Sequence, residues 1–406
     1  MSPIAVRAAI YSRSLSKRSS FQTQQLSVYR GLQSIHRQPR HLSQIAQQKN
    51  HDLRTRTRNI QYAFDPANIP AAKWASDPFS FLRPSAVASP SIQHVNLVMP
   101  SANNVPWPTS FPNSLQSKYW VEVEETARGF VLEILATRSE VKPEKYIDTI
   151  TDAAVSLLIN VAPMGNLSRM NILAKLYVFF IISDDAVDSG NKALMIPDSG
   201  ALQQGNMPEY PVYNVLAREI LSADASQGQR LLEGVMFWVS GAQRTPPSWF
   251  STLEDYITYR MVDVGAYAVF RSVEFACDVS LSETDLEVVA HLRSLCEKHF
   301  LLTNDLYSYA KEAVAQQETG KGVLNAVQTV HLLMSTSVPL AKGIVRQMIW
   351  DVERQMHKEY KRLAQNATVP QLTYAQGLIV SVAGNMFYSA TCARYARAIK
   401  GSELHR

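Results

Sequence analysis

The stretch Lys175-Leu-Tyr-Val-Phe-Phe-Ile-Ile-Ser-Asp-Asp-Ala-Val-Asp-Ser-Gly190 decides the fold class of this 406-residue chain. It predicts a strongly apolar helix whose end carries a DDxxD group, made of Asp184, Asp185 and Asp188. Residues four positions apart share a helix face at a separation of about 6 Å. Asp184 and Asp188 should therefore point to the same side, whereas Asp185 is turned away by ~100°.

Two aromatic residues continue this face toward the start of the helix. Tyr177 and Phe180 precede Asp184 by seven and four residues. An apolar face that ends in carboxylates predicts a deep pocket with a metal-binding rim, and hard oxygen ligands suit Mg²⁺. The alternative is a solvated helix end that is acidic without binding a metal, although acids at a helix C-terminus oppose the helix dipole.

A second group of oxygen donors lies in the predicted helix 284–316, within His299-Phe-Leu-Leu-Thr-Asn-Asp-Leu-Tyr-Ser-Tyr-Ala-Lys-Glu312. Asn304, Ser308 and Glu312 are four residues apart, which places them within a ~80° arc over ~12 Å. An amide, a hydroxyl and a carboxylate can chelate Mg²⁺ while adding one negative charge, so the ion can still hold phosphates. We expect Asp305 to brace a basic neighbour and Lys311 to reach phosphate oxygens; an ordinary polar helix face is the alternative.

The rest of the chain fits an all-α domain over residues 113–406. Apolar residues recur with a period of 3.6 far more often than with a period of 2. Residues 95–98 are the one convincing strand, and no Gly-rich phosphate loop, HExxH motif or repeat is visible. The predicted helices cover residues 115–137, 144–160, 167–188, 210–222, 227–242, 248–272, 284–316, 323–334, 340–365 and 371–399.

The N-terminal third has a different composition. Residues 1–60 hold 11 Lys or Arg and a single acid, and residues 61–112 hold nine of the 20 prolines. We interpret the first segment as a basic disordered tail or a mitochondrial transit peptide, and the second as a Pro-rich connector and cap. Since the basic charge lies in the tail, we expect no nucleic-acid partner.

Cysteine content and hydropathy restrict the class of protein further. Three cysteines are too few and too scattered for a disulfide framework or a cysteine-based zinc site. No apolar run reaches the ~18 residues of a membrane-spanning helix. We expect a soluble, cytoplasmic protein, with mitochondrial import by the tail as the alternative.

The two oxygen-donor strings resemble the aspartate-rich and NSE motifs of class I terpene synthases, and the chain resembles fungal sesquiterpene cyclases over roughly residues 95–400. The resemblance implies a single-domain helical bundle around a central apolar pocket. It also implies loss of diphosphate from a linear prenyl diphosphate, triggered by three Mg²⁺ ions, followed by carbocation cyclisation. The metal ligands that it implies are Asp184, Asn304, Ser308 and Glu312, and Asp188 matches a further motif position.

Two basic positions match the diphosphate-binding residues of that family. Arg260 lies on an apolar stripe, where a buried guanidinium needs an anion; it resembles the pyrophosphate-sensing arginine, and an ion pair with Asp263 or Glu254 is the alternative. Gly265 resembles the helix break whose carbonyl faces the cation, or else permits close helix packing. Arg394 and Tyr395 resemble the RY pair, whose side chains hydrogen-bond diphosphate.

The resulting prediction is a terpene cyclase that acts on farnesyl diphosphate. Arg260, Lys311, Arg394 and Tyr395 would stabilise the departing diphosphate with the metal, and Asn304 would bind near it. Aromatic faces stabilise cations without attacking them; the candidates are Tyr177, Phe180, Phe300 and Phe387, each of which also suits an ordinary core. The alternatives are geranyl or geranylgeranyl diphosphate as substrate, a chain-elongating prenyltransferase, and a non-catalytic helical scaffold. We expect a monomer or a homodimer.

Overall fold

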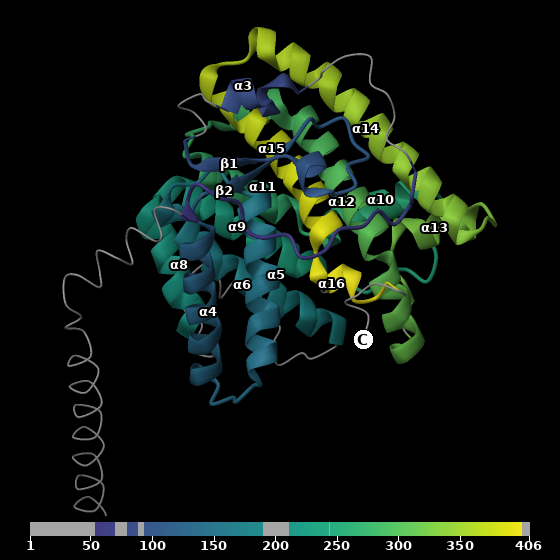
Figure 1. The fold of residues 1–406 in the computed structure, drawn as a ribbon, viewed down its shortest axis with the longest axis horizontal. Helices are drawn as coiled ribbons and strands as arrows, with labels where there is room; N and C mark the ends of the chain where they lie inside the picture. Colours follow the sequence, from purple (N-terminus) through teal and green to yellow (C-terminus); the bar gives the residue numbers. More distant parts are fainter. Residues whose placement is uncertain are drawn as a thin grey trace, which may run out of the picture. The chain divides into compact units, whose positions relative to one another are not determined.

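The computed structural model describes residues 53–69, 79–87, 93–189, 211–242, 244–320 and 322–399. The chain divides into a unit Met1–Leu53 and a compact unit Arg54–Arg406, and every element below belongs to the second unit. This unit is a helical bundle, which confirms the predicted all-α fold (Figure 1). Its main helices are α4 (Trp120–Thr137), α5 (Glu144–Val161), α6 (Leu167–Ser189), α8 (Pro211–Ala223), α9 (Ala225–Ala242), α10 (Leu253–Asp263), α11 (Ala266–Cys277), α12 (Glu283–Thr319), α13 (Ala326–Leu333), α14 (Val338–Asn366), α15 (Val369–Thr391) and α16 (Ala393–Ala396).

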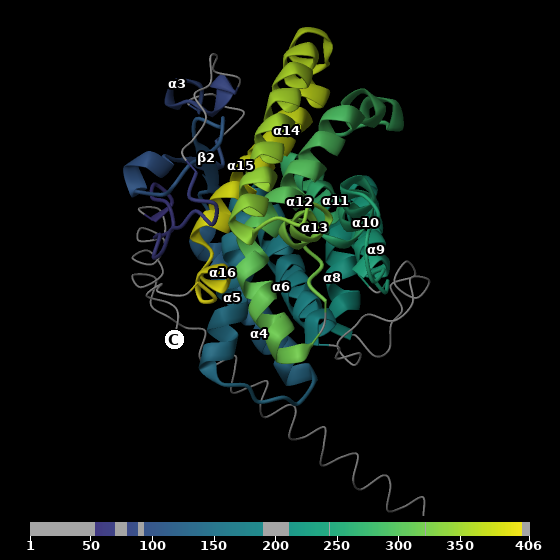
Figure 2. The ribbon, with the colours of Figure 1, turned by 90° about the vertical axis from the view of Figure 1, so that its right-hand side faces the viewer.

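Helix α15 lies in the core and packs on α12, α5 and α11 (Figures 1 and 2). From residue 377 to residue 390 every residue is buried, so this part of the helix has no solvent face. Gly384 permits the close approach of α15 to α5, because a Cβ at this position would lie 1.8 Å from the carbonyl oxygen of Asn160. Capping boxes begin α12, with Ser282 and Asp285, and α15, with Thr368 and Gln371.

The predicted strand at residues 95–98 is confirmed as β1 (Val95–Val98), but it has a partner that the sequence analysis missed. β1 pairs antiparallel with β2 (Ser114–Ser117), which the predicted helix 115–137 included in part. All four residues of β2 are buried, so the strand lacks the alternation that would have identified it. Helix α4 starts after this strand, at Trp120.

Two predicted helices are each two helices in the structure. The predicted helix 248–272 starts only at Leu253 and breaks at Gly265, between α10 and α11, where Gly265 has a φ of +78°. The predicted helix 371–399 breaks at Cys392, between α15 and α16. Cys392 is extended, with φ −75° and ψ 118°, and its backbone therefore leaves the helical region. Both breaks lie beside the cavity described below.

Short elements and an extended segment cover the bundle at its N-terminal side: η1 (Ser80–Leu82), α3 (Pro84–Val87), η3 (Pro100–Asn103) and residues 54–69. Arg54 and Arg58 form ion pairs with helices of the bundle, so the predicted boundary of the basic tail at residue 60 lies too far along the chain. The rest of the predicted tail, residues 1–52, lies outside the described residues. In the described part of the chain, none of the helices has both the length and the apolar character needed to span a bilayer.

Candidate active site

A cavity of about 110 Å³ lies where α5, α6, α9, α12 and α15 meet the two helix breaks. Its inner wall is apolar and its rim is polar. The apolar wall consists of Leu157, Phe180, Ile181, Trp238, Val264, Gly265, Ala268, Val269 and Phe300, and the polar groups are Asp184, Asn304, Asn385, Tyr388, Arg394 and Tyr395. The cavity therefore combines both predicted motif helices with the RY pair.

The first carboxylate group meets Arg394 at the rim. Nη2 of Arg394 lies 3.1 Å from Asp184 Oδ2 and 2.6 Å from Asp185 Oδ1. Burial lowers the pKa of the Arg394 guanidinium, but the two carboxylates outweigh it and raise this pKa, so the group stays charged. From helical spacing, the sequence analysis predicted that Asp185 points away from the site. In the structure, Asp185 and Asp184 both form ion pairs with Arg394. The side chain of Asp188 lies outside the described residues.

The second group of donors lies on one face of α12, as predicted. Ser308 Oγ donates a hydrogen bond of 2.6 Å to Glu312 Oε1, and Asn304 Nδ2 donates one of 2.9 Å to the hydroxyl of Tyr395. Asn325, just before α13, donates through Nδ2 to Glu312 Oε2 at 2.9 Å and to the Asp305 carbonyl oxygen at 2.8 Å. Sequence analysis missed Asn325 because the predicted helix 323–334 included it, whereas in the structure Asn325 is the N-cap of α13.

These donors fit a divalent cation. The hydrogen-bond partners of the Glu312 carboxylate within the described chain are neutral, and burial raises its pKa above the usual range. A bound cation would compensate this buried charge, and the amide, hydroxyl and carboxylate oxygens are the ligand types that Mg²⁺ prefers. Among the described residues no three His, Cys, Asp or Glu side chains gather as a metal-binding group. This agrees with a donor set in which two of the three ligands are neutral.

Arg260 of α10 contacts Asn304 and Asp305 of α12. It forms an ion pair with Asp263, and its Nη2 lies 3.2 Å from Asp305 Oδ1 and 3.4 Å from Asn304 Oδ1. Asp305, which is fully buried, also accepts hydrogen bonds from Tyr256 and from the Ala326 N–H. The expectation that Asp305 braces a basic neighbour is confirmed. Of the two acids considered as ion-pair partners of Arg260, Asp263 is one and Glu254 is not, because Glu254 pairs with Lys298.

The predicted aromatic residues divide between two places. Phe180 and Phe300 line the cavity, whereas Tyr177 is fully buried behind it, with its ring centroid 5.2 Å from that of Phe180. Tyr177 lies one helical turn before Phe180 and is enclosed by the bundle. Phe387 points into a different pocket, described below. Tyr177 and Phe387 therefore do not form the cavity wall, which corrects both predictions.

Three further placements complete the comparison with the sequence analysis. Trp238 lines the cavity and packs on Phe180 edge to face at 5.1 Å, a contact that its position on a buried helix did not reveal. Gly265 lies on the cavity wall at the predicted helix break. Lys311 is half-buried beside Glu312 on α12 and is not among the residues that line the cavity.

Comparison with known proteins identifies the class. Residues 175–355 match the model of terpene synthase family 2, C-terminal metal binding. Terpene cyclase 6 of Gibberella fujikuroi is 29% identical over 317 residues, which cover 73% of this chain and 84% of that protein. Terpene cyclase aneC of Aspergillus aculeatus is 28% identical over 370 residues, or 84% of this chain and 83% of that protein. The crystal structure of aristolochene synthase from Penicillium roqueforti shares the fold, with a TM-score of 0.57 at 20% identity over 70% of this chain and 99% of that chain.

Together these findings support a class I terpene synthase family for this chain. It is a lyase-type enzyme that binds divalent metal and cyclises a prenyl diphosphate. The motif helices and the cavity between them are consistent with this class.

Proposed function

We propose that this enzyme is a sesquiterpene cyclase, which ionises farnesyl diphosphate and cyclises the allyl cation. The observation that carries the proposal is that one small cavity joins polar and charged groups suited to diphosphate and metal to an aromatic wall. Asp184, Asn304, Arg394 and Tyr395 line this cavity, whereas Ser308 and Glu312 follow Asn304 along α12 and are not among the lining residues.

Each group has a defined part in the proposed reaction. The carbon–oxygen bond of the substrate breaks heterolytically, and its electron pair leaves with diphosphate. Three Mg²⁺ ions, bound by Asp184, Asn304, Ser308 and Glu312 with Asp188 as a further ligand, would neutralise that leaving group. Arg260, Arg394, Tyr395 and Lys311 would donate hydrogen bonds or positive charge to it.

The aromatic wall would then protect the cation. Phe180, Trp238 and Phe300 are apolar, exclude water and present ring faces, each worth roughly 0.5–2 kcal/mol to a nearby cation. No side-chain base is needed, because the released diphosphate or water can accept the final proton. Trp238 takes the place that the sequence analysis gave to Tyr177.

The cavity must widen before it can hold a substrate. Ligand pockets commonly measure about 300–1,000 Å³, and this cavity, at about 110 Å³, must widen to admit any prenyl chain. The expansion is smaller for farnesyl than for geranylgeranyl diphosphate. The single helical domain and the resemblance to sesquiterpene cyclases favour farnesyl over geranyl diphosphate.

Product analysis tests this proposal. Purified full-length protein with Mg²⁺ is incubated separately with geranyl, farnesyl and geranylgeranyl diphosphate, and the extracts are analysed by gas chromatography and mass spectrometry. We expect cyclic C15 products from farnesyl diphosphate. Cyclic products from another chain length alone would identify a mono- or diterpene synthase, and linear alcohols alone would refute cyclisation.

Metal removal and two variants test the ligand assignment. EDTA should abolish turnover and excess Mg²⁺ should restore it. Asn304→Ala and Glu312→Ala should nearly abolish turnover while circular dichroism shows an intact fold, because each removes a metal ligand. Glu318→Ala is the matched control, since Glu318 lies on the same helix and is exposed. Full activity in either ligand variant would exclude that residue as a ligand.

We also propose a cytoplasmic location for the enzyme, with the basic composition of residues 1–60 supporting mitochondrial import as the alternative. A fluorescent protein fused to the C-terminus of the full chain distinguishes the two locations by microscopy.

A further inference from the structure

The extended segment 54–65, here called the strap, crosses the bundle on the outer side of α15 (Figure 1). It contacts α4, α5, α12, α14 and the end of α15 through the interactions described below. Helices α4 and α5 lie far in the sequence from α12, α14 and α15, and α12 carries the predicted metal ligands. The strap is therefore placed to hold together parts of the bundle that the active site uses.

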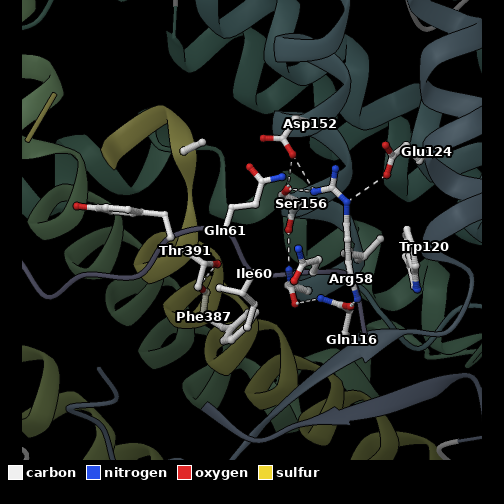
Figure 3. Close-up of a pocket in the computed structure, with 15 residues that line it drawn as sticks. Arg58, Ile60, Gln61, Gln116, Trp120, Glu124, Asp152, Ser156, Phe387 and Thr391 are labelled. Atoms are coloured by element: carbon white, nitrogen blue, oxygen red, sulfur yellow. Dashed lines mark hydrogen bonds and ion pairs between the residues drawn. The ribbon is translucent and has the colours of Figure 1, made fainter. Parts of the chain in front are cut away.

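Arg58 anchors one end of the strap (Figure 3). Its Nη1 donates to Asp152 Oδ1 at 2.8 Å and to Ser156 Oγ at 2.6 Å, both on α5, and its Nε donates to Glu124 on α4 at 3.1 Å. The backbone N–H of Arg58 donates to Gln116 Oε1 at 2.6 Å. The guanidinium thus ties the strap to two helices at once, an arrangement that a lysine cannot reproduce.

Asp65 anchors the other end. Its Oδ1 accepts a hydrogen bond of 2.6 Å from Nη2 of Arg346, a fully buried arginine on α14. The same nitrogen of Arg346 lies 3.3 Å from the hydroxyl of Tyr307, which precedes Ser308 on α12. This end of the strap is therefore linked to the helix that carries the donor triad.

Between the anchors, the strap holds the end of α15. The Phe64 N–H donates to the carbonyl oxygen of Ala390 at 3.0 Å, and the Phe64 ring packs edge to face on Tyr307 at 5.4 Å. The last carbonyls of a helix have no partner within the helix. Because α15 breaks at Cys392, the strap supplies a donor at the turn that leads into α16.

The connection from α15 to α16 separates two hollows. Phe387, Thr391 and Ala393 line an outer hollow of about 260 Å³ beside the strap (Figure 3). Tyr388, Arg394 and Tyr395 line the active-site cavity on the other side. Cys392 and Tyr395 of this connection are buried. On the cavity side the connection is held by the Arg394 ion pairs and the Asn304–Tyr395 hydrogen bond, and on the outer side by the strap's hydrogen bond to Ala390.

We propose that the strap is a positioning element for the diphosphate site, in which Arg58 and Asp65 hold residues 391–395 so that Arg394 and Tyr395 reach the diphosphate. This inference rests on the proposed function for the identity of the ligand. The strap itself does not touch the substrate. Its effect is to fix the position of the RY pair before the substrate arrives.

Arg58→Ala tests the proposal in the full-length protein, with Arg58→Lys as the conservative variant. Arg128→Ala is the matched control, because Arg128 pairs with Glu144 and Asp148 between the same two helices but does not contact the strap. Two measurements are made: hydrogen exchange of residues 388–397 without any ligand, and inhibition of turnover by inorganic diphosphate in the presence of Mg²⁺.

We expect faster exchange at residues 388–397 in Arg58→Ala and an inhibition constant for diphosphate raised about tenfold or more, since small misplacements far from the chemistry can cost up to about 100-fold. Arg58→Lys should recover little, and Arg128→Ala should behave like the wild type. Unchanged exchange in Arg58→Ala would refute the proposal whatever the substrate. If the wild type turns over substrate and Arg58→Ala has the same inhibition constant for diphosphate as the wild type, the link between the strap and the RY pair is refuted. If the wild type shows no turnover, the proposed function is refuted, and the exchange result alone decides whether the strap positions residues 388–397.

Discussion

Replacement of Asn325 tests how the site holds Glu312. Asn325 is fully buried; its Nδ2 donates to Glu312 and to the Asp305 carbonyl, and its Oδ1 accepts from the Val327 N–H at 2.9 Å, which caps α13. Asn325→Ala removes the cap, worth about 1 kcal/mol, and leaves buried acceptors with fewer donors, at about 1–3 kcal/mol. We therefore expect the free energy of unfolding to fall by about 2–4 kcal/mol in urea denaturation.

Asn325→Ser separates stability from activity. Serine is a good N-cap, so this variant should retain the cap and lose the amide donor to Glu312 and to the Asp305 carbonyl. Loss of a residue that orients a metal ligand commonly costs about 10–100-fold in metal affinity or activity. Asn325→Ser should therefore be more stable than Asn325→Ala but equally impaired in Mg²⁺-dependent turnover.

A matched control and a clear contrary result make this test decisive. Ser337 caps α14, because its side chain accepts a hydrogen bond from the Leu340 N–H. Ser337→Ala removes this cap without touching the site. It should lose a similar cap energy and keep full turnover. Wild-type turnover and an unchanged Mg²⁺ requirement in Asn325→Ser would refute the idea that Asn325 orients Glu312.

Two further predictions concern the packing of the bundle. Gly384→Ala should lower the free energy of unfolding by about 1–3 kcal/mol or more in urea, because its Cβ would meet the Asn160 carbonyl. Gly129→Ala is the control: a Cβ there has nothing within 4 Å, so this variant should be neutral or stabilising. Equal stability of the two variants would contradict the close contact between α5 and α15. Burial raises the pKa of the Cys277 thiol to about 12 and also raises the pKa values of Cys296 and Cys392. Since thiolate is the reactive form, iodoacetamide at pH 8 should label all three thiols more slowly in the native protein than in the urea-unfolded chain. Mass spectrometry showing equal rates at Cys296 and Cys392, which are buried, would contradict this environment.

The long helices could be predicted from the sequence because their signals are local. The DDxxD helix and the donor triad on α12 follow from helical periodicity alone. Periodicity predicted one continuous helix over 248–272, and the break at Gly265 was expected only from the resemblance, although glycine tolerates the positive φ found there. The break at Cys392 has no such signal, since no glycine or proline marks it. It depends on tertiary contacts, including the strap's hydrogen bond to Ala390.

The missed parts of the site depend on partners far apart in the chain. Arg58 was counted with a basic tail because composition does not reveal that Glu124 and Asp152 lie beside it. Trp238 could be assigned to a helix but not to the cavity, because its contact with Phe180 joins two helices whose relative rotation the sequence does not specify. Helical spacing placed Tyr177 and Phe180 on one face, and only the packing of neighbouring helices shows which of them reaches the cavity.

The strap has a practical consequence for handling the enzyme. Arg54, Arg56 and Arg58 give it three sites at which trypsin-like proteases cleave. A preparation nicked there would retain every helix of the bundle, and its far-ultraviolet spectrum would look native. A cut after Arg58 would separate the Arg58 anchor from residues 59–65, so poor catalysis by such material would reflect a severed peptide rather than an unsuitable substrate. Intact mass should therefore be checked before any substrate is discarded as inactive.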